Sequence, residues 1–117
     1  MDVMVHESIL RSEPAIVPQE FITRIVEELH PVQIWLFGSR AKGTARPDSD
    51  WDLFVVLPDT ASEDDLDGVK RWPRLRDIFA KRVELITTTK AEFDRWKLSL
   101  GTLDQIVNDE GFVVYGD

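Results

Sequence analysis

The 117-residue sequence contains no cysteine and no long hydrophobic run. Without cysteine, disulfide bonds and thiolate metal sites are excluded, and a reducing cytoplasm is the compartment that we expect. No apolar stretch approaches the roughly 20 residues that a membrane-spanning helix needs. The first residues also lack the basic region of a secretory signal peptide. These absences favour a small cytoplasmic globular protein, and they argue against a membrane protein.

Basic residues are scarce relative to acidic ones. The chain has 14 Lys and Arg against 22 Asp and Glu, which gives a net charge of −8. A surface that binds nucleic acid is usually basic, because it must neutralise phosphates. The charge balance therefore argues against nucleic acid as a partner.

The length and the hydrophobic pattern predict one domain. Residues 1–17 show no clear period and end at Pro18, so we expect a loosely ordered lead-in before a single domain over residues 18–117. Helical and strand periodicities alternate along that domain. Helices are expected at 18–30, 39–43, 62–81, 89–98 and 103–109, and strands at 33–37, 51–57, 82–87 and 112–115. This order predicts an α+β fold, a two-layer arrangement of a small mixed β-sheet with helices packed on it.

The long helix over residues 62–81 carries two further expectations. Pro73 lacks an amide hydrogen, so we expect the helix to break or restart there. Val69 and Leu75 are expected to be core residues, and Trp72 a core or interface residue.

The most informative motif joins the first two predicted strands. The first strand runs into Gly38-Ser39, ten residues follow, and the second strand opens with Asp50-Trp51-Asp52. Residues i and i+2 of a strand point to the same face, so the two carboxylates should project side by side. Adjacent like charges are costly unless a cation lies between them. The pattern therefore indicates a site for a divalent cation with a bound phosphate.

This motif resembles that of the nucleotidyltransferase superfamily of DNA polymerase beta, whose pattern is Gly-Ser, ten residues, then Asp-x-Asp. The similarity is greatest to its minimal single-domain (MNT) members, the antitoxins that are paired with HEPN-domain toxins. The resemblance implies a polymerase beta-like nucleotidyltransferase fold. It also implies that Gly38 and Ser39 hold the nucleotide triphosphate, and that Asp50 and Asp52 are catalytic and bind two Mg²⁺ ions.

The resemblance also implies a third catalytic, metal-binding acid on a neighbouring strand. Glu84 is the only acid of the strand at 82–87, and Val83 and Leu85 should point to the opposite face, toward the core. The family usually has Asp at this position, so Glu84 departs from its pattern by one methylene. A structural Glu84 paired with Arg82 is the alternative. Exposed strand-edge acids are the corresponding alternative for Asp50 and Asp52.

The implied activity is a Mg²⁺-dependent transfer of a nucleoside monophosphate, AMP from ATP, to an acceptor hydroxyl. By the family resemblance, the acceptor is a tyrosine of a partner HEPN toxin, and the protein acts as an antitoxin. Two alternatives stay open. One is nucleotidyl transfer to a small molecule of the aminoglycoside type. The other is a non-catalytic module with the MNT fold that neutralises its partner by contact.

Overall fold

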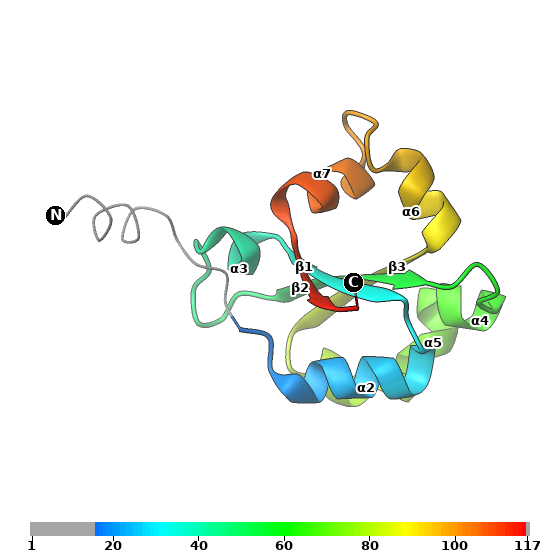
Figure 1. Cartoon of the computed structure of the whole chain (residues 1–117). Helices are drawn as coiled ribbons and strands as arrows, with labels where there is room; N and C mark the ends of the chain where they lie inside the picture. The colour runs from blue at the N-terminus through cyan, green and yellow to red at the C-terminus, as the bar shows by residue number, and fades with distance from the viewer. Residues whose placement is uncertain (1–15, 117) are drawn as a thin grey trace, which may run out of the picture.

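The computed structural model describes residues 16–116, so most of the predicted lead-in lies outside the described residues. Helices and strands alternate along the chain, largely as the sequence predicts (Figure 1). In chain order they are α2 (Gln19–Leu29), β1 (Gln33–Phe37), α3 (Ser39–Lys42), β2 (Trp51–Leu57), α4 (Glu63–Leu66), α5 (Gly68–Phe79), β3 (Val83–Thr89), α6 (Lys90–Trp96), α7 (Leu103–Glu110) and β4 (Phe112–Tyr115). No helix in this part of the chain combines the length and the apolar character that crossing a bilayer requires.

The four strands form one mixed sheet in the order β3-β2-β1-β4. Strand β1 runs antiparallel to both of its neighbours, β2 and β4, whereas β2 and β3 are parallel. The parallel pair is joined through α4 and α5, because parallel strands need a crossover connection. The predicted α+β fold with a small mixed sheet is therefore confirmed.

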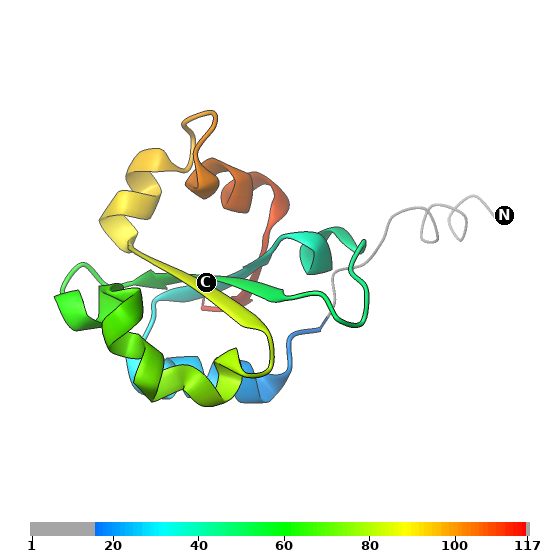
Figure 2. The same cartoon turned by 180° about the vertical axis from the view of Figure 1, so that it is seen from behind.

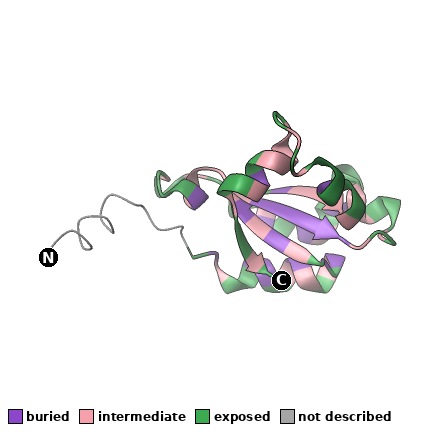
Figure 3. Ribbon diagram, turned by 45° about the horizontal axis from the view of Figure 1, so that its top comes forward, coloured by how far each residue is buried: buried purple, intermediate pink, exposed green. Residues whose placement is uncertain are grey.

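Helices cover both faces of this sheet. Helices α2 and α5 lie on one face and α6 and α7 on the other, as the front and back views show (Figures 1 and 2). Strand β2 has apolar side chains on both faces, which must both be covered. All residues from Leu53 to Leu57 are buried, and side chains alternate between the two faces of a strand (Figure 3). Leu53, Val55 and Leu57 belong to the larger core under α2 and α5. Phe54 and Val56 pack with α6 and α7, so the sheet lies between two helical layers.

The predicted break at Pro73 is wrong. Pro73 lies inside α5, and the helical segment is interrupted at Asp67, whose backbone is extended. The Asp67 carboxylate accepts hydrogen bonds from the amides of Val69 and Lys70, so it caps the start of α5. The prediction that Val69 is a core residue is also wrong, because this side chain is 83% exposed, whereas Leu75 is fully buried.

Candidate active site

The two strands that carry the predicted acids lie side by side with these acids in register. Asp52 of β2 pairs with Phe37 of β1 on one side and with Glu84 of β3 on the other. Asp52 and Glu84 therefore share one face of the sheet, opposite to the buried Val83 and Leu85, as predicted for Glu84 from strand alternation.

Gly38 brings the end of β1 directly against this pair of acids. Its backbone has φ 75° and ψ −157°, a conformation that L side chains rarely adopt. A Cβ added at this position would lie 2.1 Å from Oδ2 of Asp52, so only glycine fits. Ser39 then begins α3, and both residues are partly buried. The predicted Gly38-Ser39 turn and the Asp52 carboxylate thus form one compact site.

The electrostatics of the site follow from this crowding. The pKa of Asp52 is raised to about 6, chiefly by burial and also by the charge of Glu84, a hydrogen bond with Glu84 and the charge of Asp50. Each of these causes disfavours the ionised form of the Asp52 carboxyl group. A bound cation would relieve the repulsion, since it favours the charged form of all three carboxylates.

Asp50 is the least constrained of the three acids. It precedes β2, is exposed, and its Oδ1 lies 3.9 Å from a guanidinium nitrogen of Arg82. Among residues 16–116, no three acidic or histidine side chains converge into a ready-made metal site. The structure thus unites Asp52 and Glu84 and leaves Asp50 within range of their charge. Hard carboxylate oxygens suit Mg²⁺, which prefers one or two carboxylates together with substrate phosphates.

The alternative considered for Glu84 was an ion pair with Arg82, but in the structure Arg82 lies near Asp50 instead. Arg82 has a positive φ of 64° at the turn before β3. Its carbonyl oxygen accepts a hydrogen bond from the amide of Trp51 at 2.8 Å, which fixes the entry into β2. Glu84 makes no ion pair in the described part of the chain, so its electrostatic partner is Asp52.

Arg40 is a structural element of the site that the sequence analysis missed. Its guanidinium lies 4.1 Å from the centre of the Trp51 ring. Its Nε and Nη2 also donate hydrogen bonds of 3.2 and 2.8 Å to the carbonyl oxygen of Ser49. Arg40 therefore ties α3 to the residues just before Asp50. The available signal in the sequence was Trp51, an aromatic residue between the two aspartates that a nearby cationic side chain can stack on.

Replacing Arg40 by lysine should reduce the free energy of unfolding by about 1–3 kcal/mol, because an ammonium group cannot both stack on Trp51 and donate the paired hydrogen bonds. Urea unfolding followed by circular dichroism measures this difference. The control is Arg46→Ala, since the exposed Arg46 side chain makes none of the hydrogen bonds or ion pairs found among residues 16–116. Equal losses in both variants would contradict the structural role of Arg40.

The raised pKa of Asp52 has a consequence for stability without divalent cation. The native state holds the Asp52 proton more tightly than the unfolded chain does, so this contribution is present below about pH 4 and is lost as the pH rises through about 6. After allowance for partial solvent exposure we expect a loss of about 1–2 kcal/mol. Glu28 and Asp94 have lowered pKa values and change stability in the opposite direction.

The measurement is the difference in unfolding free energy between wild type and Asp52→Asn in chelator, taken at several pH values. The difference cancels the contribution of the other carboxylates. Wild type should lose stability relative to the variant between pH 4 and 7, and a pH-independent difference would contradict the raised pKa.

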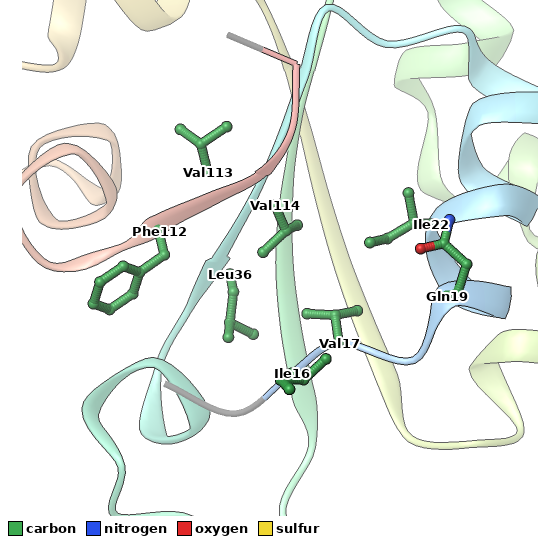
Figure 4. Close-up of a pocket in the computed structure, with 8 residues that line it drawn as sticks. All are labelled: Ile16, Val17, Gln19, Ile22, Leu36, Phe112, Val113 and Val114. Atoms are coloured by element: carbon green, nitrogen blue, oxygen red, sulfur yellow. The ribbon is translucent and has the colours of Figure 1, made fainter. Parts of the chain in front are cut away.

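A second concave region lies on the other side of the sheet. It is an apolar groove of about 430 Å³ between β4 and the start of α2, lined by Val17, Ile22 and Val114 among others (Figure 4). No charged side chain lines it, and none of the predicted site residues does. A nucleotide triphosphate therefore has no counter-charge there, and the chemistry is assigned to the acidic site.

Comparison with known proteins identifies the family of this chain. The nucleotidyltransferase domain family matches residues 18–109, a range that includes Gly38, Ser39 and all three acids. The chain belongs to the nucleotidyltransferase domain family. The predicted membership of the nucleotidyltransferases is thereby confirmed.

Individual relatives support an MNT-type domain. The chain is 36% identical over 80 residues to a Haemophilus influenzae protein named "Probable protein adenylyltransferase MntA", and the match covers 62% of this chain and 65% of that protein. The chain therefore spans just under two thirds of this relative. A crystal structure of a toxin–antitoxin with AMP-PNP is similar at a TM-score of 0.57 and 25% identity, over 86% of this chain and 75% of that one. A variant of the toxin–antitoxin MntA–HpeT gives the same TM-score at 23% identity, over 86% and 75% of the two chains.

Proposed function

We propose that this domain transfers AMP from ATP to a hydroxyl group of a partner toxin, and thereby acts as an antitoxin. The observation that carries the proposal is the in-register pair Asp52 and Glu84 packed against the Gly38-Ser39 turn. Similarity to a protein named as a protein adenylyltransferase, and to toxin–antitoxin structures, supports this choice of activity and partner. The HEPN class of the toxin, a tyrosine acceptor and a cytoplasmic location stay predictions from the family resemblance.

The residues divide the chemistry between them. Backbone amides of the Gly38-Ser39 turn and the Ser39 hydroxyl would bind the triphosphate, because glycine lets the backbone approach phosphate closely. Asp50, Asp52 and Glu84 would hold Mg²⁺. When bound, Mg²⁺ would supply positive charge for the phosphates and the acceptor oxygen.

The transfer itself is a displacement at the α-phosphorus. The acceptor oxygen forms a bond to the α-phosphorus while the bond to the β-phosphate oxygen breaks, so that pyrophosphate leaves. The acceptor proton passes to a carboxylate. Glu84 takes this role in the proposal, because it is the more exposed member of the Asp52–Glu84 pair. Positioning and charge stabilisation account for the rate enhancement in such a site.

The test uses the protein together with a candidate toxin, taken from a gene adjacent to its own. Both are incubated with ATP and Mg²⁺, and the intact mass of the toxin is measured before and after. We expect the mass to increase by one adenylyl group, with none added when Asp52→Asn replaces the wild type. Transfer to an aminoglycoside but not to the toxin would favour the small-molecule alternative. Inhibition of the toxin without any mass change, equal in wild type and Asp52→Asn, would favour the contact inhibitor.

Glu84 variants test the third acid. Glu84→Gln should lower the rate of transfer at least about tenfold and change ATP affinity much less, because the residue serves the acceptor side of the reaction. It should also lower the pKa of Asp52, because one negative charge is removed from its neighbour. Glu84→Asp restores the usual family residue with a shorter reach and distinguishes an optimised site from a weakened one. Rates of wild type and both variants that agree within error would remove Glu84 from the active centre.

A further inference from the structure

The third acid of the candidate site lies on a strand with a free outer edge. Strand β3 stands at one end of the sheet order β3-β2-β1-β4, so only β2 pairs with it in the described part of the chain (Figure 2). Glu84 is exposed, and its place beside Asp52 depends on the register of this one pairing. A strand that is paired on one side only can open locally more easily than a central strand. The position of Glu84 therefore depends on what holds the outer edge of β3.

A buried arginine of α5 reaches that outer edge. The carbonyl oxygen of Arg82 accepts a hydrogen bond from Trp51 of β2, and carbonyl groups alternate in direction along a strand, so that of Leu85 is directed to the outer edge. Arg71 is only 6% exposed, and its Nη2 donates a hydrogen bond of 3.2 Å to this oxygen. Leu85 directly follows Glu84, so Arg71 holds the strand one residue away from the acid.

The guanidinium of Arg71 also connects β3 to α4. Its Nη1 donates hydrogen bonds to the Thr87 hydroxyl at 3.1 Å and to the carbonyl oxygen of Asp65 at 3.3 Å. The Thr87 hydroxyl in turn donates a hydrogen bond of 3.3 Å to the carbonyl oxygen of Leu66. The contacts to β3 lie two residues apart, at Leu85 and Thr87, so they fix both the position and the direction of the strand.

Arg71 contributes to the geometry of β3 more than to the packing of the core. Burial lowers the pKa of Arg71, because a charge in an apolar environment is poorly solvated. Its Nε is buried without a hydrogen-bond partner among residues 16–116. A buried charge is a costly source of stability, since its desolvation offsets much of what its contacts contribute. Its directional hydrogen bonds to β3, in contrast, are contacts that an apolar side chain cannot make.

We propose that Arg71 is a positioning residue, which fixes the place of Glu84 beside Asp52 through the outer edge of β3. Arg71 acts through the backbone, because its hydrogen bonds in the described part of the chain go to other groups than the two carboxylates. This role rests on the proposed function, in which Glu84 serves the acceptor side of the transfer. A shift of β3 would then lower the rate, since a misplacement of about 1 Å in such a site can cost on the order of a hundredfold.

Hydrogen exchange of the Glu84 amide measures the placement of the strand without nucleotide or metal, and urea unfolding measures the global stability of each variant. In Arg71→Met this amide should exchange at least about tenfold faster than the fall in global stability accounts for, because β3 opens locally. Arg74→Met is the matched control, since Arg74 lies on the same helix but pairs with Glu28 and Asp65. There the amide should exchange faster only in proportion to the lost stability. No excess in Arg71→Met, or an equal excess in both variants, would overturn the proposal.

A double-mutant cycle on the transfer rate then tests whether Arg71 acts through Glu84. Arg71→Met should lower kcat at least about tenfold while KM for ATP changes less than about twofold, because the acceptor side of the reaction is affected. In a Glu84→Gln background the same substitution should cause almost no further loss, since the group that Arg71 positions is already gone. Equal losses in both backgrounds would show that Arg71 acts independently of Glu84, and they would overturn the proposal.

Thr87→Val covers the case in which Arg71→Met does not fold. It removes one hydrogen-bond acceptor of Arg71 and leaves the Leu85 contact, so it should speed exchange of the Glu84 amide in the same way but less. Exchange in Thr87→Val that follows global stability alone, as in Arg74→Met, would overturn the proposal. A wild type that transfers no nucleotide would overturn the proposed function, whereas exchange of the Glu84 amide would still decide whether Arg71 holds β3 in place.

Discussion

Replacing Asp52 by asparagine is expected to lower the rate of nucleotidyl transfer by about a thousandfold or more, because charge stabilisation by a bound metal is worth several kcal/mol. An amide has nearly the volume of a carboxylate but cannot supply the negative charge that holds the cation. Asp52 is also the most closely surrounded of the three acids, because it lies between β1 and Glu84 and against Gly38. No other carboxylate can take over its position.

The same substitution should make the cation-free protein more stable at neutral pH. Asp52 is destabilising there, since its pKa is raised to about 6 by burial and by the charges of Glu84 and Asp50. An asparagine can instead donate a hydrogen bond to Glu84. The measurement combines initial rates with urea unfolding in chelator. A variant that is inactive and unfolded would show only that the fold was lost, whereas retained wild-type turnover in a folded variant would remove Asp52 from the site.

Replacing Gly38 by alanine is expected to have the second largest effect. The new Cβ would lie 2.1 Å from Oδ2 of Asp52 and 3.0 Å from its carboxyl carbon, so the carboxylate must rotate away. Forcing alanine into this backbone conformation adds a cost of about 1–3 kcal/mol. We therefore expect reduced thermal stability and a loss of Mg²⁺-dependent ATP binding, measured by calorimetry with and without chelator.

Gly101→Ala is the matched control for this prediction. Gly101 also has a positive φ, 89°, but a Cβ there meets nothing within 4 Å. The control variant therefore has the same kind of backbone strain without disturbing the acids, and it should retain ATP binding. Equal ATP affinity in Gly38→Ala, Gly101→Ala and wild type would contradict the contact between the glycine turn and Asp52.

Local features of the site were predictable because they depend on residues close in sequence. The strand at Gln33–Phe37, the turn at Gly38-Ser39 and the strand at Trp51–Leu57 have the boundaries that the sequence predicted. A strand has a period of two, so alternation alone showed that Val83 and Leu85 face the core and Glu84 the other side. The N-caps Ser62 and Thr102 were likewise predictable, since each accepts a hydrogen bond from an amide three residues ahead.

Other features depend on what each residue meets across the fold. The sequence of α5 made Val69 a plausible core residue and Pro73 a plausible break, because hydrophobicity and ring geometry are local properties. In the structure Asp67 caps the helix, and the inward side is filled by the buried Arg71 together with Leu75. Arg71 is tolerated there because it donates hydrogen bonds to the carbonyl oxygen of Leu85 and to Thr87.

The sequence by itself determined the family, the spacing of the acids and the small mixed sheet, because these follow from short-range periodicity and from one motif. Only the tertiary structure decided that β2 and β3 are parallel with Asp52 beside Glu84, that Asp50 pairs with Arg82, and that Arg40 stacks on Trp51. The β2–β3 register and the Asp50–Arg82 pair join residues 32 positions apart, and the Arg40–Trp51 contact joins residues 11 positions apart. They are fixed by burial of both faces of β2 and by the approach that Gly38 permits, and neither can be read from the residues adjacent in the chain.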